Sequence, residues 1–496
     1  MKILPLWKPV AITAALALSA SYGLVACSND QRIAEFESAP KTTPVAERPP
    51  LGWNSFDAYD SRINEEQFRA TVDFMSDHLV DKGWEYAVID YIWWNPEPGA
   101  YNTPENYTRR VGHPNVRLDE HGKMTHPELV TMDEFGRLLP AVERFPSAAN
   151  GAGFKPLADY VHSKGMKFGL HIMRGIHRLA YEKNLPIKGA SVTAQQISDP
   201  NDQAGWLNNT FGVDARKEGA QAYYDSIFAL YASWGVDYVK ADDMMGSCGA
   251  PFYGYAKGEI EMMHTAIKNS GRDMILSLSC GEAPISQANH LKENATMWRI
   301  SADFWDRWDD LKRSFELLDK WTPYAGPGHW PDGDMIPFGR ISLDNRPHGP
   351  ERLSNFTETE HYALMSLFSI ARSPLIIGSD LLSTPIETIE TFFGNEAILA
   401  VNQYGENSRQ VVRIDDDYAV WISEDSLSDD YYIALFNLSE QTQEVTFEYK
   451  HEALEGRFQI TELWEGKELG QFSERFSQSL RSHEGRVYRL KSVSSH

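Results

Sequence analysis

The chain has 496 residues, of which 42% are hydrophobic and 12% aromatic, and its formal net charge at pH 7 is −23. This length and composition exclude a disordered chain and predict two folded domains, one of them large. The acidic balance excludes nucleic acid as a partner, because nucleic-acid binding requires basic surfaces. The 14 Trp and 22 Tyr residues supply flat faces on which sugar rings stack, although a large aromatic core explains them equally well.

The first residues have the pattern of a segment that is removed by processing. A positively charged start and an apolar stretch end in "LVAC" at Cys27, which resembles a bacterial lipobox. We therefore expect residues 1–26 to be a signal peptide, Cys27 to be lipidated, and residues 27–48 to be a polar tether. The expected location is the cell envelope, with Ser28 favouring the outer membrane and membrane contact through the lipid anchor only. A soluble periplasmic or secreted protein is the alternative.

From about residue 51 onward, short β-type runs alternate with amphipathic helical runs. The strand candidates are "LGWNSF", "EYAVIDY", "MKFGLHIM", "VDYVKADD", "MILSLSC", "MWRISAD" and "PLIIGSD", with "TPYAGPG" as a weak eighth. The helical runs are "NEEQFRATVDFMSDHLVDKG", "FKPLADYVHSKG", "GAQAYYDSIFALYASWG" and "RWDDLKRSFELLDKW". This alternation predicts a (β/α)8 TIM barrel over residues 49–395. A doubly wound open sheet is the runner-up, but no G-x-G-x-x-G follows the first strand.

Two long intervals, residues 95–152 and 174–218, follow the second and third predicted strands. Loops on this side of a barrel build active sites, so we expect both intervals to shape a substrate cleft. After about residue 396 the pattern changes to period-two alternation, as in "YYIALFNLSE", "QEVTFEYK" and "GRVYRLKSV". That pattern predicts a C-terminal antiparallel β-sandwich over residues 396–496.

Charged residues stand at the ends of the predicted barrel strands. Asp90 ends the second strand, Lys240 and Asp242 end the fourth, and Arg299 and Asp303 lie at and just after the sixth. Polar residues at the carboxyl ends of barrel strands converge on one mouth, so we expect these side chains to meet there. Two carboxylates with cations beside them suit glycoside hydrolysis. The simpler interpretations are a plain ion pair within the fourth strand and a helix cap after the sixth.

Several short blocks carry a resemblance to a known family. In chain order, "PPLGWNSF", "YAVID", "YVKADD", "WRISAD", "HWPDGDM" and "ARSPLIIGSD…AVNQ" resemble the signature blocks of glycoside hydrolase family 27, the α-galactosidase family. The resemblance covers nearly the whole mature chain. It implies a retaining exo-glycosidase that hydrolyses terminal α-D-galactosyl residues of oligo- or polysaccharides without a metal or other cofactor. It further implies Asp242 as the nucleophile and Asp303 as the acid/base. The residues that it implies around the sugar are Trp53, Asp90, Lys240, Arg299 and Asp334.

Three departures from the family pattern leave the sugar open. Typical α-galactosidases end the second strand in two adjacent Asp residues, where this chain has Asp90 and Tyr91. They usually end the third strand in Tyr, where this chain has His171. In the fifth-strand block "SCGEAP", Glu282 follows Cys280 and is displaced by one residue from the usual ligand of the 2-hydroxyl group. Tyr91, His171, Cys280 and Glu282 are therefore further candidates for substrate binding.

Other function classes fit less well. Within the enzyme class, β-L-arabinopyranose, α-glucose or a modified galactose of an algal polysaccharide are alternative substrates. A metal-dependent hydrolase is disfavoured, because the 15 His show no H-x-H or H-E-x-x-H spacing and no metal site is expected. A non-catalytic sugar-binding lipoprotein should have lost Asp242 or Asp303, and both are present. Cys248 and Cys280 could form one disulfide in an oxidising compartment, and the oligomeric state is left open.

Overall fold

A computed structural model of the chain describes residues 44–98, 117–118, 124–126, 129–204, 209–245, 254–343 and 349–493. These residues belong to one compact unit that begins at Pro44. The predicted signal peptide and most of the predicted tether, including Cys27, lie outside the described residues. The lipid anchor therefore stays a prediction. Cys248 also lies outside them.

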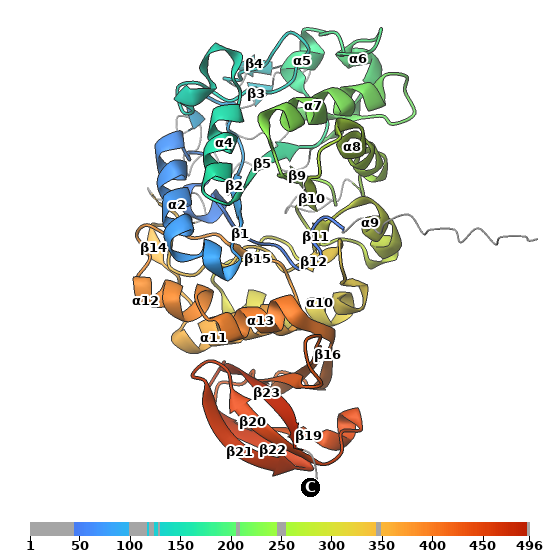
Figure 1. The fold of residues 1–496 in the computed structure, drawn as a ribbon. Coiled ribbons are helices and arrows are strands. Elements are labelled where there is room, and N and C mark those ends of the chain that lie inside the picture. The colour runs from blue at the N-terminus through green and yellow to red at the C-terminus, as the bar shows by residue number, and fades with distance from the viewer. Residues whose placement is uncertain are drawn as a thin grey trace, which may run out of the picture. The chain divides into compact units, whose positions relative to one another are not determined.

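Eight parallel strands form one sheet at the centre of the N-terminal domain (Figure 1). They are β1 (Leu51–Asn54), β2 (Tyr86–Ile89), β5 (Lys167–Met173), β9 (Tyr238–Asp242), β10 (Ile275–Leu278), β11 (Met297–Arg299), β12 (Trp330–Asp332) and β15 (Leu375–Ile377). The strands pair in the order β12-β11-β10-β9-β5-β2-β1-β15. A parallel bridge between Ile336, just after β12, and Ile377 in β15 joins the two ends of the sheet. The predicted TIM barrel is confirmed.

The seventh strand differs from the prediction. The run "TPYAGPG" is not a strand, since Thr322–Tyr324 forms a short 3-10 helix and β12 begins only at Trp330. Pro323 lacks an N–H for a strand ladder, and glycines such as Gly328 weaken a strand. Trp330, in contrast, is fully buried and supplies a large side chain to the interior of the barrel.

Helices follow the strands and surround the sheet (Figure 1). They are α1 (Phe56–Tyr59), α2 (Glu65–His78), α4 (Lys155–Ser163), α5 (Arg178–Glu182), α6 (Ala194–Ile197), α7 (Ala220–Trp234), α8 (Lys257–Ser270), α9 (Ala288–Asn294), α10 (Trp308–Trp321), α11 (Glu358–Ile370), α12 (Ile386–Thr388) and α13 (Glu396–Tyr404). Helix α2 begins with a capping box: Asn64 Oδ1 accepts from the Gln67 N–H at 2.9 Å, and Gln67 Oε1 accepts from the Asn64 N–H at 3.2 Å. Helix α7 ends at Gly235, whose φ of 85° favours glycine. The four predicted helical runs are confirmed as α2, α4, α7 and α10.

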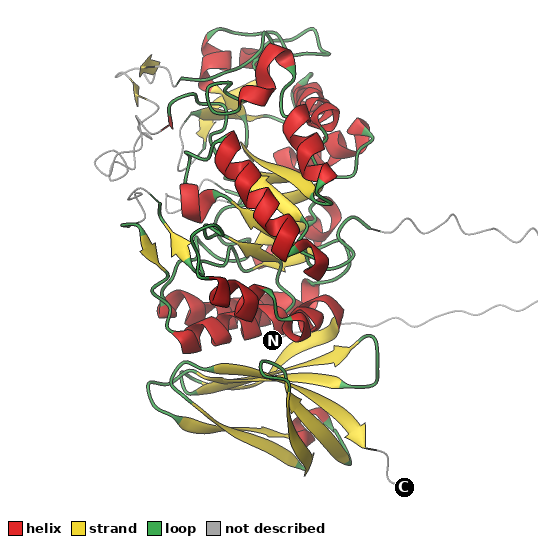
Figure 2. Cartoon of the chain, turned by 60° about the vertical axis from the view of Figure 1, so that its left-hand side comes forward, coloured by secondary structure: helices red, strands yellow, loops and turns green. Residues whose placement is uncertain are grey.

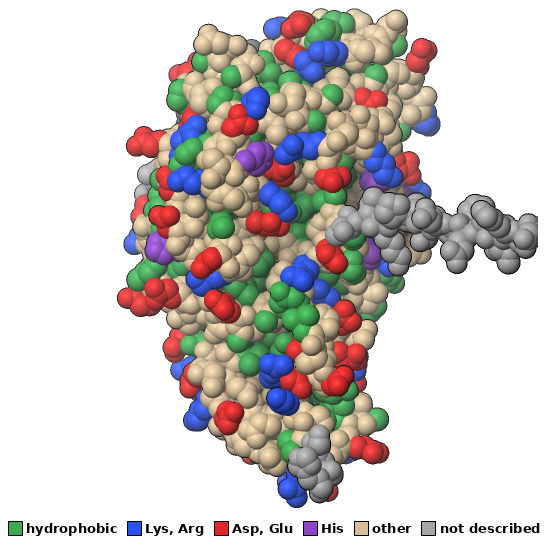
Figure 3. All heavy atoms as spheres, in the orientation of Figure 1, with side chains coloured by type: hydrophobic (Ala, Val, Ile, Leu, Met, Phe, Trp, Pro, Cys, Tyr) green, Lys and Arg blue, Asp and Glu red, His purple; other side chains and the backbone are tan. Residues whose placement is uncertain are grey.

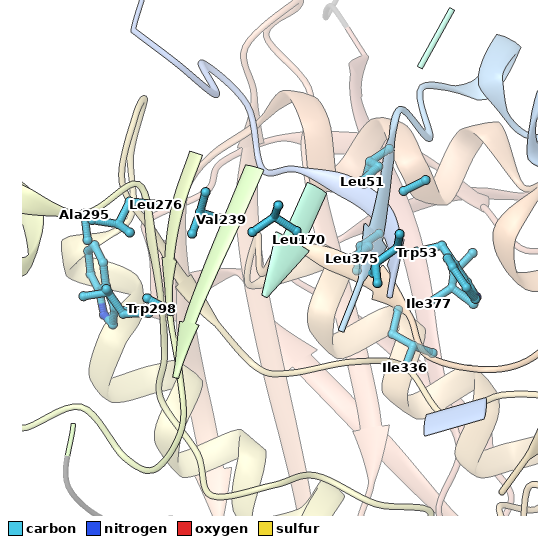
Figure 4. Packing of buried hydrophobic residues seen from close by; sticks show 14 of the residues in the cluster. Leu51, Trp53, Leu170, Val239, Leu276, Ala295, Trp298, Ile336, Leu375 and Ile377 are labelled. Carbon is cyan, nitrogen blue, oxygen red and sulfur yellow. The ribbon is translucent and has the colours of Figure 1, made fainter. Parts of the chain in front are cut away.

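Alternation along the barrel strands separates two sets of buried side chains. One set, including Leu51, Trp53 and Leu170, packs with the surrounding helices (Figure 4). The other set fills the interior of the barrel and consists of Tyr86, Val88, Tyr238, Ile275, Met297, Trp330, Met335 and Ile376. This interior is tightly filled, because a Cβ atom on Gly52 would lie 2.8 Å from the Cβ of Tyr86. Every second residue of a strand therefore faces the barrel axis.

The two predicted long intervals contain secondary structure of their own. Strands β3 (Arg117–Leu118) and β4 (Met124–His126) pair between β2 and α4. Strands β6 (Ile176–His177), β7 (Ser198–Gln203) and β8 (Thr210–Val213) form a small sheet between β5 and α7. A further pair, β13 (Arg340–Ile341) and β14 (Arg352–Leu353), follows β12. These segments leave the carboxyl ends of barrel strands, where active-site loops are expected.

After α13 the chain is built mainly from antiparallel strands (Figure 2). They are β16 (Gly405–Ile414), β17 (Tyr418–Asp425), β18 (Tyr431–Asn437), β19 (Gln443–Glu448), β20 (Arg457–Glu462), β21 (Lys467–Ser473), β22 (Arg475–Leu480) and β23 (Gly485–Val493). Six of them form a sheet in the order β16-β17-β18-β23-β20-β21, and β19 pairs with β22. The β-sandwich is confirmed; its first strand begins at Gly405, because residues 396–404 form α13.

Period-two alternation lets the six-stranded sheet bury both faces. Val420 and Ile422 pack into a cluster with Val445 of β19. On the opposite face, the ring centroid of Phe436 lies 4.9 Å from that of Phe315 in α10. The sheet thus packs on the two-stranded sheet on one side and on barrel helices on the other.

Acidic and basic side chains are mixed over the face that Figure 3 shows. The net charge of −23 is therefore not gathered into one acidic patch on that face. Within the described ranges, no helix has the length and apolar character needed to cross a membrane.

Candidate active site

Polar side chains stand where barrel strands end on the inner face. These inward residues are Asn54 on β1, Asp90 after β2, His171 on β5, Lys240 and Asp242 on β9, Arg299 on β11, and Asp332 on β12. The pairing of β5 with β9 places His171 opposite Lys240 and Met173 opposite Asp242. The strand alternation that fills the interior with apolar residues thus ends in a ring of charges at the carboxyl-terminal mouth.

Asp90 is the acceptor at the centre of one half of this ring. Its Oδ2 accepts hydrogen bonds from Lys240 Nζ and from Asn54 Nδ2, each at 2.8 Å, and its Oδ1 accepts from the Tyr91 N–H at 2.8 Å. Burial would raise the pKa of Asp90, but the charges of Lys240 and His171 and these hydrogen bonds hold it at about 2. Asp90 is therefore a fixed anion that orients the Lys240 ammonium group.

Asp242 is buried, with 9% of its side chain exposed, and it faces His171. The Nε2 atom of His171 lies 3.2 Å from Asp242 Oδ2, so a proton on Nε2 makes the ring a donor to this carboxylate. Burial would raise the pKa of Asp242, but the hydrogen bond and charge of His171, together with the charge of Lys240, hold it below its ordinary value. Among the described residues, Oδ1 of Asp242 has no hydrogen-bond partner. Oδ2 of Asp242 is thus held by His171, whereas Oδ1 has no partner among the described residues.

A second half of the ring is organised by Arg299. Its Nη2 lies 2.7 Å from Asp334 Oδ2 and 3.3 Å from Asp303 Oδ1. Asp334 is further fixed by the Phe304 N–H, which donates to its Oδ2 at 2.8 Å. Asp303 differs from the other carboxylates, because 46% of its side chain is exposed. Arg299 therefore joins a buried carboxylate to one that is open to solvent.

Three residues predicted to bind substrate are occupied elsewhere. Trp53 is fully buried on the outer face of β1; its indole N–H donates to the Ser379 carbonyl at 2.8 Å, and its ring packs on Phe68 of α2. The alternation that turns Asn54 inward turns Trp53 outward. Glu282 forms an ion pair with Arg313 of α10. Cys280 is buried and disulfide-bonded. The structure therefore does not bring these three side chains into the ring of charges.

Tyr91 is also fully buried, but it lies directly beside the ring. Its ring centroid is 5.9 Å from that of His171 and 5.8 Å from that of Phe56. Tyr91 thus packs behind His171 and beside Phe56.

The sequence reasoning missed three residues of this mouth, Asn54, Phe56 and Asp332. Asn54 supplies one of the two side-chain donors to Asp90, and the period-two pattern of its strand was the signal that could have found it. Phe56 lies beneath Lys240, whose Nζ is 5.6 Å from the ring centroid. Phe56 is therefore an aromatic residue that contacts the charged ring, as Tyr91 does through His171.

The donor set does not resemble a metal centre. In the part of the chain that the structure describes, no group of three or more His, Cys, Asp or Glu side chains is placed to hold a metal ion. The cations of the mouth are instead side chains, Lys240 and Arg299, and each lies within hydrogen-bond distance of a carboxylate. This arrangement suits chemistry on a neutral, hydroxyl-rich substrate, with carboxylates as the reactive groups.

Comparison with known proteins assigns the chain to a class. A family model described as alpha galactosidase A matches residues 210–404, and one described as the alpha galactosidase C-terminal beta sandwich domain matches residues 415–490. The crystal structure of a family 27 β-L-arabinopyranosidase from Geobacillus stearothermophilus is 40% identical, covers 91% of this chain and 98% of its own, and has a TM-score of 0.81. Alpha-galactosidase 2 of Arabidopsis thaliana is 27% identical over 76% of this chain and 72% of its own. Alpha-N-acetylgalactosaminidase of Gallus gallus is 25% identical over 74% of each chain.

The barrel, the C-terminal sandwich and these relatives together define a glycoside hydrolase. The match to the Geobacillus enzyme extends over nearly the whole of both chains, so it includes both domains and the mouth between the barrel strands. The chain belongs to glycoside hydrolase family 27.

Proposed function

We propose that the chain is a retaining exo-glycosidase in which Asp242 is the nucleophile and Asp303 is the acid/base. The observation that carries this proposal is the unequal setting of the two carboxylates. Asp242 is buried and its pKa is held below the ordinary value, which keeps it ionised and ready to attack. Asp303 is about half exposed, so it can exchange its proton with a leaving group or with water.

The first step forms a covalent intermediate. A carboxylate oxygen of Asp242 attacks the anomeric carbon, and the bond to the leaving oxygen breaks while Asp303 gives that oxygen its proton. The donor contact from His171 holds one oxygen of Asp242, so the carboxylate does not rotate freely as the bond forms. In the second step Asp303, now ionised, takes a proton from water as the water oxygen attacks the same carbon. The bond between that carbon and Asp242 breaks, which restores the Asp242 carboxylate and releases the sugar with its original configuration.

The first candidate substrate is a terminal α-D-galactosyl residue. The family match and the alpha-galactosidases among the relatives support it. Asp90 and Lys240 offer an acceptor and a donor 2.8 Å apart, which suits two neighbouring hydroxyl groups of a pyranose ring. Asp334 and Arg299 offer a second such pair on the opposite side.

The second candidate is a terminal β-L-arabinopyranosyl residue. This sugar has the ring configuration of α-D-galactose but carries hydrogen where galactose has its CH2OH group. Two observations favour it. Tyr91, a bulky ring, stands where typical α-galactosidases have a second Asp at this strand end, and the 40% identical Geobacillus relative is a β-L-arabinopyranosidase.

A comparison of nitrophenyl glycosides tests the proposal. We expect the α-D-galactoside or the β-L-arabinopyranoside to give the highest kcat/KM, and the α-D-glucoside to be rejected, because its 4-hydroxyl group leaves a polar partner of the site unpaired. The N-acetyl-α-D-galactosaminide shows whether the 2-position tolerates an acyl group. The configuration of the first product, followed by NMR, should be that of the substrate. Preference for the glucoside or an inverted product would overturn the proposal.

The same substrates test the role of Tyr91. We expect Tyr91→Asp to raise kcat/KM for the α-galactoside relative to the β-L-arabinopyranoside by about tenfold, because a carboxylate adds an acceptor near the CH2OH group. Tyr91→Phe is the matched control, since it keeps the ring and removes only the hydroxyl group. A clear preference of the wild type for α-galactoside, unchanged by Tyr91→Asp, would show that Tyr91 does not set specificity.

The pH profile tests the role of His171. We expect His171→Phe to lower kcat by roughly 10- to 100-fold, the cost of losing one hydrogen bond to a charged group. It should also move the acid limb of kcat/KM to higher pH, because burial then raises the pKa of Asp242 without an opposing donor. His171→Gln keeps a donor and should restore part of both quantities. An acid limb that stays in place in His171→Phe would contradict this role.

A further inference from the structure

We infer that Arg174 is a positioning residue that fixes the backbone of the nucleophile Asp242. Arg174 follows β5 directly, and only 4% of its side chain is exposed. Its backbone N–H donates to the Asp242 carbonyl at 3.2 Å, and its Nε donates to the Asp243 carbonyl at 3.0 Å. Arg174 thus holds two consecutive carbonyl groups at the residue that reacts. The inference rests on the proposed role of Asp242 and concerns what holds it in place.

The backbone at this point needs to be held. Asp243 has a φ of 64°, in the left-handed region that residues with a Cβ adopt at a cost. Its side chain also faces Arg174, with Oδ2 at 3.3 Å from Nε. Because Asp242 immediately precedes this turn, a relaxed conformation at Asp243 would swing the Asp242 carboxylate away from its place in the mouth.

The other side of the guanidinium group is fixed by two segments far apart in sequence, β7 and α8. Asp202 of β7 accepts two hydrogen bonds from Arg174. Nη2 donates to Oδ1 at 2.6 Å, and Nη1 donates to Oδ2 at 3.0 Å. Glu259 of α8 accepts from Nη1 at 3.0 Å and also contacts the Tyr224 hydroxyl of α7. A planar fork with five donors satisfies these acceptors together, and a lysine cannot.

The packing around this network is close at Gly212. A Cβ atom on Gly212 would lie 2.2 Å from Asp202 Oδ2 and 2.9 Å from Arg174 Nη1. The small sheet of β6, β7 and β8 is therefore pressed against the guanidinium group. Strand β7, which belongs to the long interval after β5, therefore helps to hold Arg174 and, through it, the backbone of the nucleophile.

Arg174 also balances the charge of Asp243, the residue next to Asp242. Burial lowers the pKa of Arg174, but Glu259, Asp202 and Asp243 raise it above its ordinary value, so the group stays a cation. On the side of the mouth, the charged and titratable groups that face Asp242 are His171, Lys240, Asp90 and Arg299. Removing the cation leaves the buried Asp243 carboxylate next to Asp242 without the guanidinium charge that faces it, which raises the pKa of the nucleophile.

A matched arginine lies at the opposite end of the same strand. Arg272 donates to the Val236 carbonyl at 2.7 Å and to the Gly235 carbonyl at 3.1 Å, and it pairs with Asp237 just before β9. Both arginines therefore hold backbone carbonyls and a carboxylate beside β9. Only Arg174 does so at the end that carries Asp242.

The experiment compares Arg174→Lys and Arg174→Met with Arg272→Lys and Arg272→Met in the full chain, on the nitrophenyl glycoside that the wild type cleaves best. We expect Arg174→Lys to lower kcat by roughly 10- to 100-fold with little change in KM, because displacing a reacting group by about 1 Å has effects of this size. Arg174→Met should in addition move the acid limb of kcat/KM upward. The Arg272 variants should lower Tm without changing kcat per folded molecule or the pH profile. Equal kcat values in Arg174→Lys and Arg272→Lys would overturn the inference.

Two further measurements keep the outcome decisive. If the Arg174 variants do not fold, Gly212→Ala is used, since its methyl group presses on the network without removing a charge. A folded Gly212→Ala enzyme with wild-type kcat would also overturn the inference. Asp242→Asn separates this inference from the proposed function. If Asp242→Asn keeps its activity, Asp242 is not the nucleophile and the proposed function is refuted. If Asp242→Asn is inactive while Arg174→Lys has the kcat of the wild type, only the role of Arg174 is refuted.

Discussion

Asp242→Asn is expected to lower kcat by three or more orders of magnitude while the protein stays folded, because an amide does not form the covalent glycosyl intermediate. The substitution keeps the size of the side chain, and the amide oxygen still accepts from His171 Nε2, which lies 3.2 Å from Oδ2 in the structure. The loss should therefore appear in kcat far more than in Tm. Steady-state kinetics and thermal unfolding of the same preparations measure both.

The neighbouring carboxylate is the control for this result. Asp243→Asn removes a charge from the next residue, which pairs with Arg174 and is not the proposed nucleophile, so its loss of kcat should be much smaller. Adding azide to Asp242→Ala should restore turnover and give a glycosyl azide of inverted configuration, since azide then attacks from the side that Asp242 left. The opposite result is that Asp243→Asn loses more kcat than Asp242→Asn and that azide rescues Asp243→Ala instead of Asp242→Ala. Asp243 would then be the nucleophile.

Much of the fold could be predicted because the barrel repeats one simple pattern. Each buried strand is followed by an amphipathic helix, and "MKFGLHIM" and "VDYVKADD" show the pattern as β5 and β9. The pattern failed where a strand is short. Strand β12 contains only Trp330–Asp332, including a proline, and three residues give too little periodicity to detect. In the nearby run "TPYAGPG", the proline and glycine residues were the signal against a strand.

In the candidate site, too, some residues could be predicted from the strand pattern and others were assigned wrongly or missed. Asp90, Lys240, Asp242 and Arg299 were predictable because each stands at the inward end of a strand. Trp53 was assigned from a short matching block, and the alternation of β1, which turns it outward, was not applied to it.

Contacts between distant segments could not be predicted from one sequence. The pairing of Glu282 with Arg313 depends on how α10 packs, and the partners of Arg174 come from β7 and α8. Such pairings are set by tertiary packing, which local patterns do not report.

Asp303→Ala is expected to separate substrates by their leaving groups. Glycosides with a poor leaving group need protonation, so their kcat/KM should fall by roughly 10²- to 10⁴-fold, whereas a dinitrophenyl glycoside should be largely spared. The fold should persist, because Arg299 keeps its contact with Asp334 at 2.7 Å when Asp303 is shortened. Asp309→Ala is the matched control, since it removes an exposed carboxylate six residues further on in the first turn of α10 and should leave the dependence on the leaving group unchanged.

The second step of the reaction gives Asp303→Ala a distinct signature. Without a base to activate water, the glycosyl-enzyme formed from the dinitrophenyl substrate should accumulate, so that kcat and KM fall together. Azide needs no base, because it is already an anion, and it should raise kcat by attacking that intermediate. The resulting glycosyl azide should keep the configuration of the substrate, since two displacements have occurred at the anomeric carbon. The azide from Asp242→Ala should be the opposite anomer, because only one displacement occurs there. NMR of the two products from the same substrate therefore assigns both roles at once, and identical anomers would show that the nucleophile and the acid/base are not Asp242 and Asp303 in these roles.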